Sequence, residues 1–133
     1  MTPTAALLAF ALITMTAITV EILYTYATQG FGFGFSSNRP RVDRTPMGLR
    51  IERTYRNQAE SAAYIVPVLA AAAVLGLDSA AAQTTAAIIV AGRAAFVALY
   101  YTGLPFIRIL GFGAGSFGTL FLAYLVVTAL ATT

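Results

Sequence analysis

The sequence has no cysteine and no histidine among its 133 residues. Without cysteine the chain has no disulfide, no thiolate nucleophile and no thiolate metal ligand of its own, and its redox compartment cannot be inferred. Without histidine it also lacks the side chain that most often shuttles protons and binds metals near neutral pH. The sequence therefore predicts no metal site.

Charge is scarce as well. The chain has 8 basic residues, all arginine, and 5 acidic residues, so 10% of it is charged, whereas soluble domains contain about 25%. Hydrophobic residues make up 59%, and the mean hydropathy is +0.79. So few charges cannot cover this much apolar surface in water, and the composition predicts an integral membrane protein rather than a soluble enzyme. The net charge of +3 does not indicate nucleic-acid binding, because the arginines adjoin apolar spans and form no basic tail.

Four apolar stretches are long enough to cross a bilayer as helices, which requires about 20 residues. They cover approximately residues 3–27, 48–77, 80–103 and 105–132. The second and third connections are short, which makes neighbouring helices run antiparallel. The predicted fold class is all-α, an integral-membrane up-down four-helix bundle that occupies residues 1–133 as a single domain. The first stretch lacks a basic leading region and runs on to Tyr26, so we expect a retained helix rather than a cleaved signal peptide.

The first connection, residues 28–47, is the longest and alternates glycine with phenylalanine near its start. We interpret it as a flexible interfacial loop rather than a phosphate-binding loop, since it has no lysine and no Gly-Lys-Ser/Thr ending. Arginines gather in this loop and in the turns after it, whereas the opposite side has only Asp78. The positive-inside rule then predicts that the loop is cytoplasmic and that both termini face the other side. Arg108 lies at the same end, either as a snorkelling anchor or as a functional group.

Small residues recur inside the spans, in the run Ala70–Ala73 and in the series Gly111, Gly113, Gly115 and Gly118. Such residues let helices approach one another closely in a membrane. We therefore expect close helix packing at these positions, and the pattern is compatible with an oligomer without requiring one.

One face of the second predicted helix carries polar side chains that ascend from the interface. At about 100° per residue, this face contains Arg50, Arg53, Arg56, Asn57, Glu60, Tyr64 and Pro67. A patch that binds lipid headgroups would explain the lower arginines. The amide, the carboxylate and the phenol above them indicate a polar cleft between helices, because ionisable groups inside a membrane usually face a partner or a cavity.

Arg93 lies deep in the third predicted helix, with Phe96 and Tyr100 on the same face at +3 and +7. A buried arginine is costly without a partner, so a carboxylate is expected near it, and Glu60 and Glu21 are the candidates. We interpret Glu21, itself deep in the first apolar stretch, as a structural counter-ion rather than a catalytic group.

The sequence patterns of these two polar faces resemble those of a known protein family. The pattern Arg50-x-x-Arg53-x-x-x-Asn57-x-x-Glu60 resembles the second-helix signature of the MAPEG proteins (membrane-associated proteins in eicosanoid and glutathione metabolism). The segment from Arg93 through Phe96, Tyr100 and Pro105 to Arg108 is similar to the third-helix pattern of the same family. The chain length, the four spans and the long first loop agree with this resemblance over nearly the whole chain.

The resemblance implies a homotrimer whose sites lie between neighbouring subunits near the cytoplasmic face, with glutathione as the cosubstrate in members that are transferases or peroxidases. By motif position, the glutathione-binding wall would contain Arg53, Asn57, Glu60, Phe96 and Tyr100. The other predicted binding residues on the same polar faces are Arg50, Tyr64 and Arg93. Arg108 would take the catalytic place of the arginine that stabilises the glutathione thiolate. Arginine forks suit the two carboxylates of glutathione, and a guanidinium lowers the pKa of a nearby thiol.

Three functions follow as alternatives. The leading prediction is a membrane-bound glutathione transferase or peroxidase, on which a lipophilic electrophile or lipid hydroperoxide arrives laterally from the lipid. The second is a non-catalytic lipid-binding or scaffold protein of the same fold, because a fold does not settle activity. A transporter or channel subunit that uses Glu21, Glu60 and Arg93 ranks lower, since nothing in the sequence repeats or inverts. The expected partners are other copies of the chain and membrane lipids, and not nucleic acid.

Overall fold

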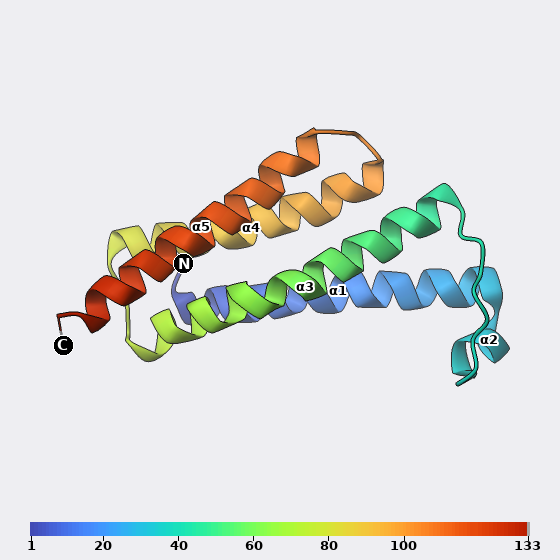
Figure 1. The fold of residues 1–133 in the computed structure, drawn as a ribbon, viewed down its shortest axis with the longest axis horizontal. Helices are drawn as coiled ribbons and strands as arrows, with labels where there is room; N and C mark the ends of the chain where they lie inside the picture. The colour runs from blue at the N-terminus through green and yellow to red at the C-terminus, as the bar shows by residue number, and fades with distance from the viewer. Residues whose placement is uncertain (133) are drawn as a thin grey trace.

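The computed structural model describes residues 1–132, and these residues form five helices and no strands. The helices are α1 (Pro3–Gln29), α2 (Phe31–Phe35), α3 (Pro46–Val74), α4 (Ala80–Thr102) and α5 (Ile107–Leu130). The four long helices follow the long axis of the molecule, and α2 lies at one end of it (Figure 1). Both termini lie toward the other end, together with the connection between α3 and α4 (Figure 1). The predicted all-α class is confirmed.

Three of the long helices, α1, α4 and α5, are long and apolar enough to cross a membrane. Together with the composition, they identify an integral membrane protein. The remaining long helix, α3, is the longest at 29 residues, but its first half carries the charged residues Arg50, Glu52, Arg53, Arg56 and Glu60. Among the four long helices, α3 thus carries the most charged residues, and they all lie in its first half.

Local sequence signals explain where the helices begin and end. Thr45 caps the start of α3 by accepting a hydrogen bond from the Gly48 amide at 3.1 Å, and proline follows it at the first helical position, where no amide hydrogen is needed. Ser79 caps α4 in the same way. Gly103 ends α4 in the left-handed region, with φ of 76°, where glycine is the favoured residue.

The segment predicted to be a loop, residues 28–47, contains the short helix α2. Its sequence, Phe-Gly-Phe-Gly-Phe, has low helix propensity because of the glycines. Contacts between side chains outweigh this propensity, since the rings of Phe31 and Phe35 both lie against Tyr26 at the end of α1. Such contacts depend on the chain folding back after Gly30, which hydropathy does not reveal.

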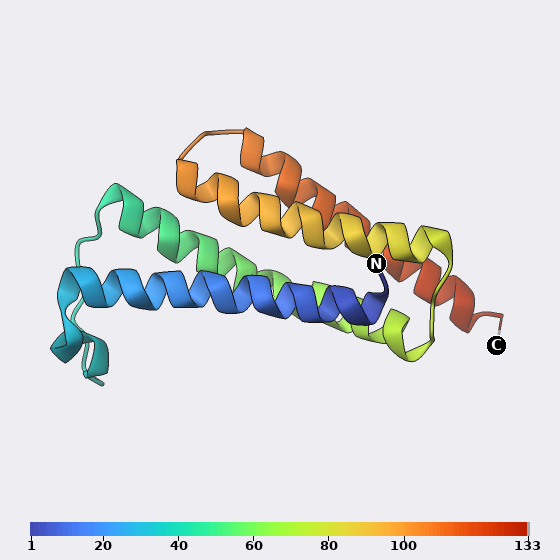
Figure 2. The ribbon, with the colours of Figure 1, turned by 180° about the vertical axis from the view of Figure 1, so that it is seen from behind.

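The long helices pack in two antiparallel pairs, α1 with α3 and α4 with α5 (Figures 1 and 2). Helix α3 also contacts α4 and α5, and α1 contacts α4. The apolar core lies where these helices meet, toward the end that holds the termini; its largest fully buried members are Phe10, Ile65, Leu69, Ile89 and Leu122. The polar half of α3 thus extends beyond this core toward the end that holds α2.

Glycines bring α4 and α5 into backbone contact, as the small-residue pattern predicts for α5. A Cβ at Gly92 would lie 2.8 Å from the Gly111 carbonyl oxygen and 2.8 Å from the Gly115 amide nitrogen. Real Cβ atoms do not approach backbone so closely, so any side chain at Gly92 has to separate the two helices. At Gly113, by contrast, a Cβ would meet only the Phe117 ring, at 3.8 Å.

We therefore expect Gly92→Ala to lower the stability of the folded protein by about 1–3 kcal/mol, the usual cost of overpacking. The measurement is the thermal unfolding midpoint of the protein purified in detergent. Gly113→Ala is the matched control, and its midpoint should stay equal to or above that of the wild type, because alanine has the higher helix propensity. Equal midpoints for the two variants would contradict the close α4–α5 contact.

Candidate functional site

Helix α3 divides its polar residues between two faces. The buried face includes Thr54, Gln58 and Ser61, which point toward the other helices. The opposite face exposes Arg53 and Glu60. Residues three or four positions apart lie on the same face of a helix. One polar set therefore faces the interior of the bundle, and the other faces the outside.

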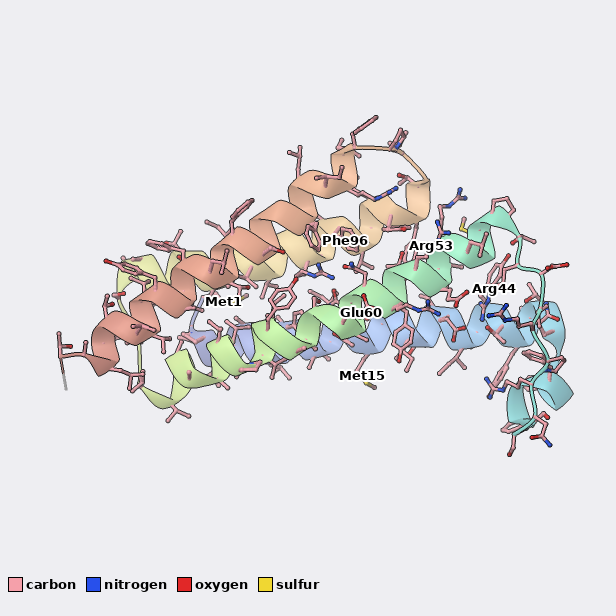
Figure 3. The ribbon with its side chains drawn as sticks, in the orientation of Figure 1. Met1, Met15, Arg44, Arg53, Glu60 and Phe96 are labelled. Carbon is pink, nitrogen blue, oxygen red and sulfur yellow. The ribbon has the colours of Figure 1, made fainter. Side chains whose placement is uncertain are left out.

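A groove of about 220 Å³ opens on the exposed face of α3. Its lining residues are Arg53, Arg56, Asn57, Glu60 and Tyr100. Figure 3 shows Arg53 and Glu60 along α3, with Phe96 on the neighbouring α4. Two cations, a carboxylate, an amide and a phenol therefore share one concave surface, which suits a ligand that carries both negative and positive charge.

Arg108 reaches the same place from the start of α5. Its guanidinium carbon lies 4.5 Å from the centre of the Tyr100 ring, over the ring face, where the negative potential of the aromatic ring attracts a cation. The turn before α5 makes this approach possible, because Phe106 adopts a φ of 65°, which is unusual for a residue with a side chain. The structure thus brings Arg108 to the edge of the groove through Tyr100.

Arg93 is fully buried, and its partners are neutral amides. Its Nε and Nη2 atoms donate to Gln58 Oε1 at 3.0 and 2.8 Å, and Nη2 also donates to Asn57 Oδ1 at 2.9 Å. The expectation of a carboxylate beside Arg93 was wrong for the described residues, where Arg93 forms no ion pair with Glu60 or Glu21. The reason is geometric: Glu60 is two residues beyond Gln58 and therefore points to the opposite face of α3.

Four other predicted binding residues lie outside the groove. Arg93 faces the interior of the chain and is fully buried there. Phe96 is only 4% exposed and packs between the Arg93 guanidinium and Tyr100, so it supports the groove from behind. Tyr64 shares a hydrogen bond with Ser116 Oγ on α5 at 3.3 Å.

Arg50, the fourth of these residues, packs beneath the turn that ends α4. Its guanidinium Nη1 lies 2.8 Å from the position of a Cβ on Gly103, and its Nη2 lies 3.8 Å from Met47 Sδ. It is thus at the negative end of the α4 dipole, where a cation is stabilising. In the single chain, Arg50 therefore has a structural role: it stabilises the end of α4.

Four charged residues form a chain of ion pairs that leads to the groove. Glu21 Oε1 accepts from Arg44 Nη2 at 3.1 Å, Arg44 Nε pairs with Glu52 Oε2 at 3.0 Å, and Glu52 Oε1 accepts from Arg56 Nη2 at 2.8 Å. Glu21 is therefore a structural counter-ion, as predicted from its depth in α1, but its partner is Arg44 rather than Arg93. This chain of ion pairs fixes the first loop against α1 and α3 and holds one groove arginine from behind.

The sequence interpretation assigned no binding role to two residues of this region, Arg56 and Gln58. Arg56 follows Arg53 by three residues, a spacing that places both on one helical surface, and this spacing was the available signal. Gln58 carried no comparable signal, because a neutral amide in a polar helix is unremarkable until a buried cation is found beside it.

Comparison with known proteins gives one finding. The family model described as the MAPEG family matches residues 1–128 of the chain. None of the curated proteins and none of the solved structures compared with the chain matches it. The matched range contains α1 to α4, most of α5 and every residue of the groove.

Proposed function

Because this chain belongs to the MAPEG family, we propose that it is a membrane-bound glutathione transferase or glutathione-dependent peroxidase that acts on lipophilic electrophiles or lipid hydroperoxides. Membership in the family is general support for an integral membrane protein of glutathione or eicosanoid metabolism. The observation that carries the finer proposal is the groove, with Arg53, Arg56, Glu60 and Tyr100 in its wall and Arg108 over Tyr100.

Each group of glutathione has a complement in this groove. The guanidinium groups of Arg53 and Arg56 suit its two carboxylates, because a guanidinium donates two parallel hydrogen bonds to a carboxylate. The Glu60 carboxylate suits its ammonium group, and the Asn57 amide suits a peptide group. Neither cysteine nor histidine is needed on the chain, because glutathione supplies the sulfur.

Arg108 is proposed to stabilise the thiolate. A cation beside a thiol lowers the pKa of that thiol, and the thiolate is the nucleophile. In the transferase reaction the sulfur forms a bond to the electrophilic carbon while the leaving group departs with its electron pair. In the peroxidase reaction two glutathione molecules are oxidised to the disulfide while the hydroperoxide is reduced to an alcohol and water.

We further propose that the active form is a homotrimer of four-helix subunits with the groove at the boundary between neighbours. In the single chain Arg53, Arg56 and Glu60 remain exposed, so a bound ligand would contact one wall only. Another copy would supply the second wall and exclude water, which strengthens charge interactions. By the positive-inside rule, the end with the arginine-rich loop would face the cytoplasm and the termini the opposite side.

The test is a titration of the purified protein with glutathione, followed by the ultraviolet absorbance of the thiolate. We expect absorbance that saturates with glutathione and is absent with S-methylglutathione, which has no ionisable thiol. No thiolate signal, together with phospholipid that copurifies, would instead favour a non-catalytic lipid-binding or scaffold protein of the same fold.

We expect Arg53→Ala to weaken glutathione binding by about tenfold to a hundredfold, because a charge-assisted hydrogen-bond pair contributes about 1.5–3 kcal/mol. Arg53→Lys keeps the charge but loses the planar fork, so its dissociation constant should fall between those of Arg53→Ala and the wild type. Both constants come from competition against labelled glutathione in detergent. Undiminished binding by Arg53→Ala would count against the groove as the glutathione site.

A further inference from the structure

A cluster of aromatic rings and exposed arginines lies at the end of the molecule that holds α2, separate from the groove. We define the α2 patch as Tyr26, Phe31, Phe35, Arg39 and Arg41. Phe31 and Phe35 are four residues apart in α2, so both rings project to one side of this short helix. They are 67% and 77% exposed in the chain.

The aromatic part of the α2 patch has a fixed arrangement. Ring centres are 5.3 Å apart for Tyr26 and Phe31, 5.7 Å for Tyr26 and Phe35, and 6.4 Å for Phe31 and Phe35. A Cβ at Gly34 would overlap the Tyr26 ring, so only glycine lets α2 lie this close to α1. The fold therefore holds two large apolar rings outward at the end of a helix that is apolar enough to cross a membrane.

The arginines of the α2 patch form no ion pair with the described residues. Arg39 donates from Nε to the Ser36 carbonyl at 3.1 Å and from Nη2 to the Gly34 carbonyl, both neutral groups. Arg41 is exposed and forms no ion pair within the described part of the chain. Both arginines line a cavity of about 390 Å³, together with Phe33 and the acidic residues Asp43 and Glu52. Arg44 lines it too, but two carboxylates already neutralise that residue.

Apolar rings next to unpaired arginines match the boundary between the acyl chains and the headgroups of a bilayer. Phenylalanine is among the residues that interfacial helices bury at this depth, and arginine forks bind phosphate oxygens with two hydrogen bonds. An anionic membrane surface attracts each nearby basic residue by an amount that corresponds to about fivefold in binding. We propose that the α2 patch binds the headgroup of an anionic phospholipid, with the two phenylalanine rings inserted beside it.

A second protein chain fits this patch less well. Stable protein interfaces bury about 1,200–2,000 Å² in total and remove charge from their centre. The α2 patch exposes only the two rings of Phe31 and Phe35, with arginines beside them. The charge and the small apolar area both favour a lipid.

The absence of tryptophan from the chain allows a direct test. Phe35→Trp places a single fluorescent reporter in the α2 patch, and Phe121→Trp places one on α5, where Phe121 is 48% exposed and far along the chain from the arginines. Each variant is reconstituted into phosphatidylcholine vesicles that contain a small fraction of brominated phosphatidylglycerol or of brominated phosphatidylcholine. Bromine quenches tryptophan only within close range, so quenching reports which lipid lies next to the reporter.

We expect brominated phosphatidylglycerol to quench Trp in the Phe35→Trp variant roughly three- to fivefold more than brominated phosphatidylcholine does. The Phe121→Trp control should show equal quenching by the two lipids. Adding Arg39→Gln and Arg41→Gln to Phe35→Trp should remove the preference while quenching itself persists. The proposal is overturned by equal quenching in Phe35→Trp, by a preference that survives the two glutamine substitutions, or by absence of quenching with either lipid, which would mean that protein covers the patch.

Discussion

Gln58→Leu is expected to destabilise this protein by about 3–5 kcal/mol, a large fraction of the roughly 5–15 kcal/mol by which folded proteins are stable. Gln58 accepts two of the three side-chain hydrogen bonds that Arg93 donates, and both residues are fully buried. Leucine has a similar volume but no acceptor. The substitution therefore leaves a buried guanidinium group with half of its hydrogen bonds unmade, which costs more than the net value of the bonds themselves.

The measurement is the unfolding free energy in detergent, or the monodisperse yield where the variant does not fold. Gln83→Leu is the matched control: its side chain donates only to the Asp78 carbonyl near the start of α4, and we expect a change of less than about 1 kcal/mol. The double variant Arg93→Met with Gln58→Leu should recover most of the loss, because it removes the buried charge along with its acceptor. A Gln58→Leu protein as stable as the wild type would show that Arg93 does not depend on this amide.

Arg108→Leu is expected to separate the binding of glutathione from its activation. Arg108 lies over Tyr100 at the edge of the groove and is not among the residues that line it, so the glutathione dissociation constant should stay within about threefold of the wild-type value. A unit charge about 4 Å from the sulfur is worth up to about 4 kcal/mol near a protein surface, and each pKa unit corresponds to about 1.4 kcal/mol. We expect the thiolate bound at neutral pH to fall by about tenfold to a hundredfold.

The direction of the pH dependence follows from the same charge. A free thiol ionises near pH 8.5, and a guanidinium beside it moves this ionisation to lower pH. The thiolate absorbance of the wild-type complex should therefore appear at lower pH than that of Arg108→Leu. Arg108→Lys, which keeps a cation, should retain part of the shift. Identical titration curves for wild type and Arg108→Leu would remove Arg108 from the proposed catalytic role.

Several elements of the fold and of the site could be predicted from the sequence because their determinants are local. Helix starts were predictable where capping residues precede apolar runs, as at Ser79, and the polar face of α3 followed from the period of the helix. The contact of Arg93 with Phe96 and of Phe96 with Tyr100 also follows from spacing along one helix, and the structure confirms both. Such contacts need no knowledge of how the helices are arranged.

Contacts between helices and loops were not predictable in the same way. The partner of Glu21 is Arg44, 23 residues away in a loop whose path depends on α2 folding back against α1. Arg93 donates to two amides, and Gln58, which accepts two of its hydrogen bonds from 35 residues earlier, lies on the face of α3 that the sequence interpretation did not choose. Opposite charge suggested carboxylates, but the rotation of α3 about its axis decides which side chains face α4, and hydropathy fixes that rotation poorly when both faces are polar.

The sequence by itself determined that this chain belongs in a membrane, that it is helical, and that its polar chemistry resides in the first half of α3 and at both ends of the Arg93–Arg108 segment. These properties follow from composition and from helical period, which act over short distances. Only the tertiary structure decided which arginines line a groove and which are structural. That division depends on the rotation and packing of α3 against α1 and α4, which turns Gln58 toward Arg93 inside the chain and Arg53 and Glu60 toward the groove outside it.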